Sequence, residues 1–140
     1  MSKVAVVFWS GTGNTEAMAE AVADGARSAG AEVEVFANAD FSADLADQFD
    51  AIAFGCPSMG VEVLEEDEFE PMFSEVEGSL KDKKISLFGS FGWGDGEWMR
   101  NWEERCHDDG AVLACESVTC MNDPDDEAIA ACKALGEALA

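Results

Sequence analysis

The stretch VAVVFWSGTGNTEAMAEAVADGARSAG, residues 4–30, decides the fold. It begins with a continuous apolar run, Val4–Trp9, which is typical of a strand buried on both faces of a parallel sheet. A turn over Ser10–Thr15 follows, and Glu16–Ala29 is predicted to be a helix because apolar and small residues recur every three or four positions. Gly30 stands where a glycine would end that helix. The stretch therefore predicts the strand, turn and helix that open an α/β fold.

The rest of the chain repeats this alternation. Further strands are predicted over Val33–Val35 (half-buried, near an edge), Ala51–Gly55, Ile85–Gly89 and Ala111–Ala114, the last with an extension to Val118 left open. Further helices are predicted after Ser42, around Phe69, Met72, Phe73 and Val76, over Glu97–Asp108, and from Asp123 or Pro124 onward. Such alternation indicates a doubly wound five-stranded parallel sheet with helices on both faces. No linker or repeat interrupts it, so we expect a single domain over residues 1–140.

The chain is strongly acidic, with 30 acidic and 8 basic residues and a net charge of −22. This charge disfavours nucleic acid and anionic membranes as partners and favours a basic protein surface. No apolar run approaches the roughly 20 residues of a membrane helix, and the N-terminus lacks the pattern of a signal peptide. We therefore predict a cytoplasmic protein.

The cysteines predict no metal or disulfide chemistry. There are five of them, no Cys-x-x-Cys occurs, and His107 is the one histidine, so the spacing of a zinc site is absent. We expect reduced, mostly buried thiols.

The loop after the first strand has the composition of a phosphate-binding turn. It consists of Ser10, Gly11, Thr12, Gly13, Asn14 and Thr15. It leads into a helix N-terminus, whose N–H groups and dipole attract anions, and its glycines allow close backbone approach. It lacks the lysine of a Walker A loop, and Glu16 stands where a dinucleotide fingerprint has its third glycine. The alternative, a plain turn with a helix cap, remains open.

Two more loops are rich in glycine and follow predicted strands. The second loop is Cys56-Pro57-Ser58-Met59-Gly60-Val61-Glu62 and the third is Ser90-Phe91-Gly92-Trp93-Gly94-Asp95-Gly96. In such sheets, ligands bind beyond the carboxyl ends of the strands, where strand order reverses. Met59 and Trp93 are suited to cover the two faces of a flat aromatic ligand. Trp93 as a cap on the core is the alternative.

Three segments, SGTGNTEAMA, GCPSMGVEVLE and LFGSFGWGDGEW, resemble those of short-chain, clostridial-type flavodoxins. The resemblance extends over the whole chain and implies a flavodoxin-like three-layer sandwich with strand order 2-1-3-4-5. It also implies FMN as a non-covalently bound cofactor. The expected function is that of a low-potential one-electron carrier that shuttles between oxidised, semiquinone and hydroquinone states, with no catalytic residues of its own.

The resemblance also assigns roles to residues. It implies that Ser10–Thr15 hold the FMN phosphate, and that the cofactor contacts Pro57, Ser58, Met59, Gly60, Val61, Glu62, Ser90, Phe91, Gly92, Trp93 and Gly94. Met59 and Trp93 would flank the ring, Glu62 would accept a hydrogen bond from ring N3–H, and backbone N–H groups of Ser90–Gly94 would bind the pyrimidine side. The Gly60–Val61 peptide would turn its carbonyl toward N5. The chain has no tyrosine to stack on the ring, so which of Trp93, Met59 and Phe91 covers which face stays open.

An acidic run follows the second loop: Glu62, Glu65, Glu66, Asp67, Glu68 and Glu70. Negative charge near the cofactor opposes addition of a second electron, so the semiquinone/hydroquinone couple should have the more negative potential. The same residues would steer partners with basic docking surfaces, such as ferredoxin-type oxidoreductases and reductases. A solvated helix face without such a role is the alternative reading. We expect a monomer.

Three other functions compete with electron transfer. An FMN-dependent NAD(P)H reductase is disfavoured because the loops carry no basic residue for a dinucleotide's phosphates. A phosphoreceiver domain needs acidic residues where the chain has Ser10-Gly11 and Cys56. A flavin-free binding module is the third.

Overall fold

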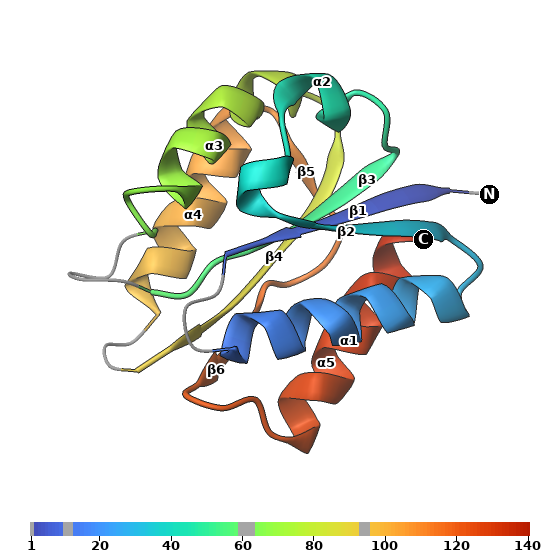
Figure 1. Cartoon of the computed structure of the whole chain (residues 1–140), viewed down its shortest axis with the longest axis vertical. Helices are drawn as coiled ribbons and strands as arrows, with labels where there is room; N and C mark the ends of the chain where they lie inside the picture. Colours follow the sequence, from blue (N-terminus) through green and yellow to red (C-terminus); the bar gives the residue numbers. More distant parts are fainter. Residues whose placement is uncertain (1, 10–12, 59–63, 93–95) are drawn as a thin grey trace.

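One parallel sheet crosses the middle of the molecule, with helices on both faces (Figure 1). The computed structural model describes residues 2–9, 13–58, 64–92 and 96–140. The strands lie in the order β2-β1-β3-β4-β5, as predicted, and β6 also pairs with β4. Their bounds are β1 Lys3–Phe8, β2 Glu32–Ala37, β3 Ala51–Gly55, β4 Lys84–Phe91, β5 Val112–Leu113 and β6 Val118–Met121.

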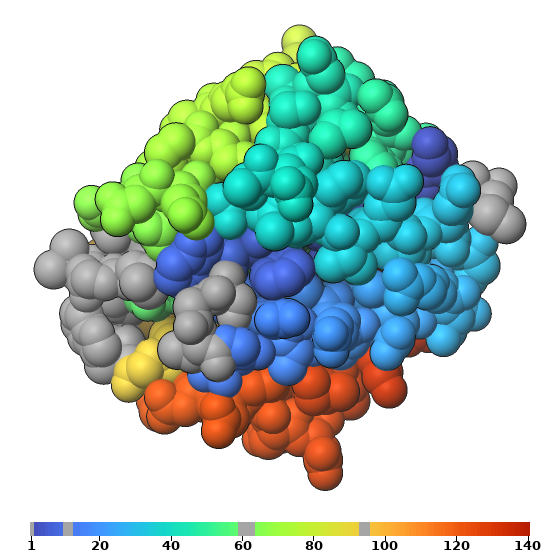
Figure 2. All heavy atoms as spheres, in the orientation of Figure 1, coloured from blue at the N-terminus to red at the C-terminus, as the bar shows by residue number. Residues whose placement is uncertain are grey.

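The helices form the two outer layers. They are α1 Asn14–Ser28, α2 Ala43–Ala46, α3 Phe69–Val76, α4 Glu97–Asp108 and α5 Asp126–Leu139, with 3₁₀ turns η1 Asn38–Asp40 and η2 Glu77–Ser79. α1 and α5 pack side by side on one face, in blue and orange-red in Figure 2. α3 and α4 cover the other face (Figure 1). This is the predicted three-layer sandwich.

The two cores follow from the alternation of side chains along a strand. On β1, Val4 and Val6 pack with α1 and α5, whereas Ala5 and Val7 pack with α3 and α4. All four are fully buried. A central strand that meets helices on both sides needs such a continuous apolar run.

The predicted helices largely agree with the structure. α4 has the predicted bounds, and the four apolar residues predicted for α3 are buried. Ser42 caps α2 by accepting a hydrogen bond from the Leu45 N–H at 3.4 Å. Gly30, with φ of 98°, follows the end of α1, where the left-handed backbone favours glycine. No helix among the described residues is long and apolar enough to cross a membrane.

The outermost strand differs from the prediction because it is interrupted. Leu113 pairs with Ile85 and Val118 pairs with Phe88, so five residue steps of the outer chain match three steps of β4. The two extra residues cannot stay in register, and the segment between β5 and β6 therefore leaves the sheet.

Two boundaries also differ. β4 continues to Phe91 instead of ending at Gly89, because its last residues pair with β6. The last helix begins at Asp126, since its N-cap is Asp125, whose carboxylate accepts the Ala128 N–H at 2.8 Å. On the edge strand β2, Val35 is 41% exposed, and no strand among the described residues pairs with the outer side of β2.

The five cysteines are all free, as predicted. Cys56, Cys106 and Cys132 are buried, and Cys115 and Cys120 are half-buried. Burial raises the pKa of the Cys106 and Cys132 thiols to about 12 each. These thiols therefore remain protonated at neutral pH.

Candidate cofactor site

The chain segments that leave β1, β3 and β4 lie side by side at one edge of the sheet. The Trp9 N–H donates to the Gly55 carbonyl at 3.0 Å, and the Cys56 N–H donates to the Phe88 carbonyl at 3.1 Å. Beyond the end of β3, the Ser58 N–H donates to the Ser90 carbonyl of β4 at 3.0 Å. The described residues at which the three predicted loops leave the strands therefore lie close together.

α1 begins at the same edge (Figure 1). Gly13 is the N-cap, with φ of 93°, and Thr15 in the first turn is 1% exposed. The hydrogen-bond donors that Gly13, Asn14 and Thr15 offer are neutral. A helix N-terminus attracts anions through its N–H groups and dipole. This donor set fits one phosphate group. Ser10, Gly11 and Thr12 lie outside the described residues.

The second loop is described only at its ends. Pro57 and Ser58 are half-buried, and Leu64 is buried at the far end. The predicted ring contacts Met59, Gly60, Val61 and Glu62 lie outside the described residues, so their roles stay predictions.

The third loop begins later than predicted, because Ser90 and Phe91 belong to β4. Their carbonyls accept hydrogen bonds from the Ser58 and Asn122 N–H groups. The Phe91 ring packs on Trp98, with centroids 5.5 Å apart. This contact turns part of the ring toward the core. Gly92 is exposed, whereas Trp93 and Gly94 lie outside the described part of the chain.

Glu65 is the residue at this edge whose position the sequence analysis missed. It belongs to the acidic run, for which a solvated helix face is the alternative interpretation, yet it is only 6% exposed. Burial alone would raise the pKa of its carboxyl, but hydrogen bonds from the N–H groups of Phe69, Glu68 and Asp67 outweigh burial and lower the pKa. No short sequence pattern distinguishes Glu65 from the other carboxylates of the run, because its burial depends on backbone N–H groups that the fold brings to it.

The rest of the run is more exposed. Glu66, Asp67 and Glu68 are exposed, and Glu70 is half-buried. The Glu68 carboxylate accepts the indole N–H of Trp9 at 3.0 Å, and this bond joins the end of β1 to the start of α3. The acidic side chains therefore lie at the same edge as the three loops.

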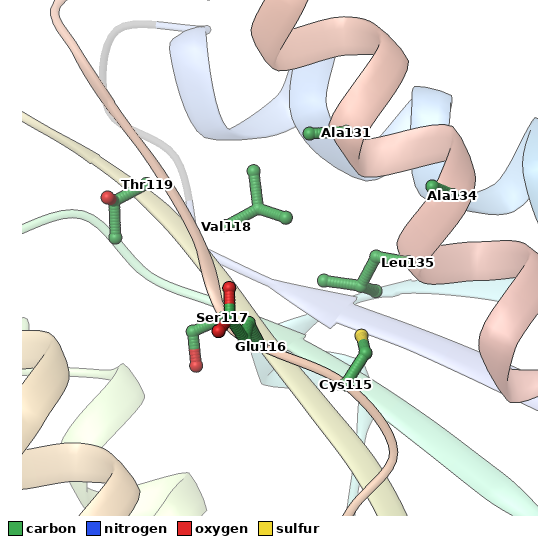
Figure 3. Close-up of a pocket in the computed structure, with 8 residues that line it drawn as sticks. All are labelled: Cys115, Glu116, Ser117, Val118, Thr119, Ala131, Ala134 and Leu135. Atoms are coloured by element: carbon green, nitrogen blue, oxygen red, sulfur yellow. The ribbon is translucent and has the colours of Figure 1, made fainter.

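A separate cavity of about 500 Å³ opens between the β5–β6 segment and α5 (Figure 3). Its lining residues are Cys115, Glu116, Ser117, Val118, Thr119, Ala131, Ala134 and Leu135. None of them belongs to the predicted loops, and the one charged group, Glu116, would repel a phosphate. The cavity does not match the donor set that FMN requires.

Comparison with known proteins identifies the family. The chain matches the Flavodoxin family over residues 6–135. It is 46% identical over 137 residues to the flavodoxin of Megasphaera elsdenii, with 98% of each chain covered, and 46% identical over 121 residues to that of Clostridium beijerinckii, with 86% and 88% covered. The solution structure of two-electron reduced M. elsdenii flavodoxin superposes with a TM-score of 0.89, covering 97% of each chain. The chain thus belongs to the flavodoxin family of FMN-dependent electron carriers.

Proposed function

We propose that this flavodoxin binds FMN across the carboxyl ends of β1, β3 and β4, with the phosphate at Ser10–Thr15 and the ring between Met59 and Trp93. The observation that carries the proposal is the set of backbone hydrogen bonds between the ends of these strands, which brings the bases of the three loops together. When bound, FMN supplies one-electron redox chemistry. The chain's own residues hold it, orient it and adjust its potentials.

At the phosphate end, the chain would bind through neutral donors. No lysine or arginine stands between Lys3 and Arg27, so N–H groups and hydroxyls of Ser10–Thr15 must carry the interaction. Each hydrogen bond to a charged group contributes about 1.5–3 kcal/mol, and several together hold one phosphate firmly. Gly13 supports this role because its positive φ lets the backbone turn into α1.

At the ring end, the contact between Phe91 and Trp98 favours Met59 and Trp93 as the two flanking side chains. Glu62 would accept a hydrogen bond from ring N3–H, and backbone N–H groups near Gly92 and Gly94 would bind the pyrimidine side. The Gly60–Val61 peptide would turn its carbonyl toward N5 on reduction, since glycine tolerates both backbone conformations. Structures of both redox states with one unchanged peptide would contradict this turn.

Titration of the apoprotein with FMN and with riboflavin tests the proposed site. FMN should bind at least about a hundredfold more tightly than riboflavin, because two or more charge-assisted hydrogen bonds are lost without the phosphate. Thr15→Ala should reduce this preference, whereas Trp93→Ala should weaken both ligands equally. A protein that retains no FMN after gel filtration, or that binds both ligands equally, would overturn the proposal.

We also propose that the protein is a carrier and not a reductase, and that residues 1–140 form one monomeric domain. The loops offer no basic residue for a dinucleotide, and a net charge of −22 opposes self-association. Five free thiols fit a reducing, cytoplasmic compartment. Steady-state NAD(P)H oxidation by the purified protein, or a dimer mass in light scattering, would contradict these points.

A further inference from the structure

The Glu65 carboxylate forms a compact hydrogen-bond cluster at the start of α3. Its Oε1 accepts the Glu68 N–H at 2.7 Å and the Phe69 N–H at 2.9 Å, and its Oε2 accepts the Asp67 N–H at 2.9 Å. Both carboxylate oxygens are therefore used, and the side chain is 6% exposed. A buried charge is tolerated when it is paired in this way.

The backbone of Glu65 is joined to the other end of the second loop. Its N–H donates to Cys56 Sγ at 3.4 Å, and Cys56 is fully buried at the end of β3. Residues 56 and 65 therefore lie in contact, although eight residues separate them in sequence and 59–63 lie outside the described residues. We name the group formed by Cys56 and Glu65 the loop clasp.

The clasp is also joined to the segments that flank the third loop. The Cys56 carbonyl accepts the indole N–H of Trp98 at 3.2 Å, and Trp98 is buried in the first turn of α4. Gly89 on β4 lies so close that a Cβ there would collide with the same carbonyl. The bases of the second and third loops are thus linked through one residue.

We propose that Glu65 is a positioning residue, which through Cys56 fixes the spacing of the second and third loops and so sets FMN affinity and the two one-electron potentials. This inference rests on the proposed function, because those loops are the proposed ring contacts. Glu65 itself does not need to touch FMN. Its role differs from the general effect of the acidic run, which depends on charge alone.

Replacing Glu65 by glutamine separates the positioning role of this side chain from the effect of its charge. Glu65→Gln keeps the size of the side chain but replaces one acceptor oxygen with an amide NH₂, which would face a backbone N–H donor. Glu66→Gln is the matched control. It removes the same charge from the next residue, whose side chain is exposed. Glu65→Asp keeps the charge and both acceptor oxygens.

FMN titration and potentiometry of the three variants test the proposal. Glu65→Gln should raise the Kd of FMN by about tenfold or more, the equivalent of one charge-assisted hydrogen bond. It should also change the gap between the two potentials more than Glu66→Gln does, and speed hydrogen exchange at residues 67–69. Glu65→Asp should recover part of the loss. Equal effects of Glu65→Gln and Glu66→Gln on Kd and potentials would overturn the proposal and leave charge as the explanation.

A second pair of variants keeps the test decisive if Glu65→Gln does not fold. Cys56→Ala removes the sulfur acceptor without changing charge, and Cys106→Ala removes another fully buried thiol, near the far end of α4. Cys56→Ala should weaken FMN binding several-fold and Cys106→Ala should not. Equal FMN affinities of Cys56→Ala and Cys106→Ala would overturn the proposal that the loop clasp sets FMN affinity. Trp93→Ala tests the proposed FMN site independently of the proposed role of Glu65. If this variant leaves FMN affinity unchanged, the proposed site itself is wrong.

Discussion

Asp109 is the C-cap residue of α4, and its carboxyl lies beside a second acidic side chain, that of Glu77 in η2. Burial first, and then the hydrogen bond and charge of Glu77, raise the pKa of Asp109 to about 6. Arg105 opposes this shift, whereas it lowers the pKa of Glu77. The ionised form of Asp109 is therefore disfavoured by folding at neutral pH.

Asp109→Asn should stabilise the protein at pH 7.5 by about 1 kcal/mol, a value reduced by solvent screening. Because the folded pKa is raised, the stabilising contribution of Asp109 is present below its usual pKa of 3.8 and is lost as pH rises through about 6. The advantage of asparagine should thus vanish toward pH 4. Urea unfolding at several pH values measures it, and a pH-independent difference would contradict the assignment.

At the scale of elements, Arg105 of α4 joins this helix to α3 and η2. Its guanidinium binds the Glu70 carboxylate at 2.7 and 2.8 Å and the Glu77 carboxylate at 2.8 and 2.9 Å, and lies 4.9 Å from the centre of the Phe73 ring. The bond to Arg105 lowers the pKa of both carboxyls, so this stabilisation is present above their usual pKa and is lost as pH falls.

Arg105→Ala should cost about 2–3 kcal/mol in free energy of unfolding, because it leaves two half-buried carboxylates without their partner. Arg105→Lys should recover less than half, since an ammonium cannot form paired bonds to two carboxylates. Arg27→Ala is the control: its pair with Asp24 is exposed at 3.7 Å and should matter by less than about 0.5 kcal/mol. Equal losses for the two alanine variants would show that the bonds of Arg105 to Glu70 and Glu77 contribute no more than an exposed ion pair.

The contact between α1 and α5 depends on two glycines. A Cβ on Gly136 would collide with the Val22 carbonyl, and one on Gly25 would collide with the Lys133 carbonyl. Gly136→Ala should therefore destabilise the protein by about 2 kcal/mol despite the better helix propensity of alanine. A Cβ on Gly78 would have no atom within 4 Å, so Gly78→Ala should leave the stability almost unchanged. Thermal unfolding compares the two, and a Gly136→Ala variant as stable as wild type would disprove the close contact.

The sequence predicts some of the helices and strands but not others. Val4–Val7 and α3 were predictable because burial on one or two faces leaves a strong periodic pattern. The interruption between β5 and β6 was not, since it depends on pairing with β4, a contact distant in sequence. For the site, the convergence of the loops was predictable from topology, whereas the burial of Glu65 depends on backbone N–H groups that sequence patterns do not place.

At the scale of the whole molecule, charge is unevenly distributed. Lys3 begins β1, Lys84 begins β4, and Lys81 precedes it, so these lysines lie at the amino end of the sheet. The exposed acidic residues 66–68 and Asp123, Asp125, Asp126 and Glu127 follow the opposite, carboxyl end. This asymmetry would orient the cofactor edge toward a basic partner.

Electron transfer from the reduced protein to a basic c-type cytochrome should therefore slow as salt increases from about 10 to 200 mM, because screening shortens the range of the attraction from about 30 Å to less than about 8 Å. Ferricyanide, a small anion, is the control and should react faster with added salt. Stopped-flow rates measure both. Identical salt dependence for the two acceptors would exclude electrostatic steering.

The most direct test of the account is a crystal structure of the protein with FMN bound. We expect the phosphate within hydrogen-bonding distance of N–H groups and hydroxyls of Ser10–Thr15, and the ring between Met59 and Trp93. FMN seated elsewhere, such as in the cavity between the β5–β6 segment and α5, or a phosphate held by lysine or arginine, would contradict it.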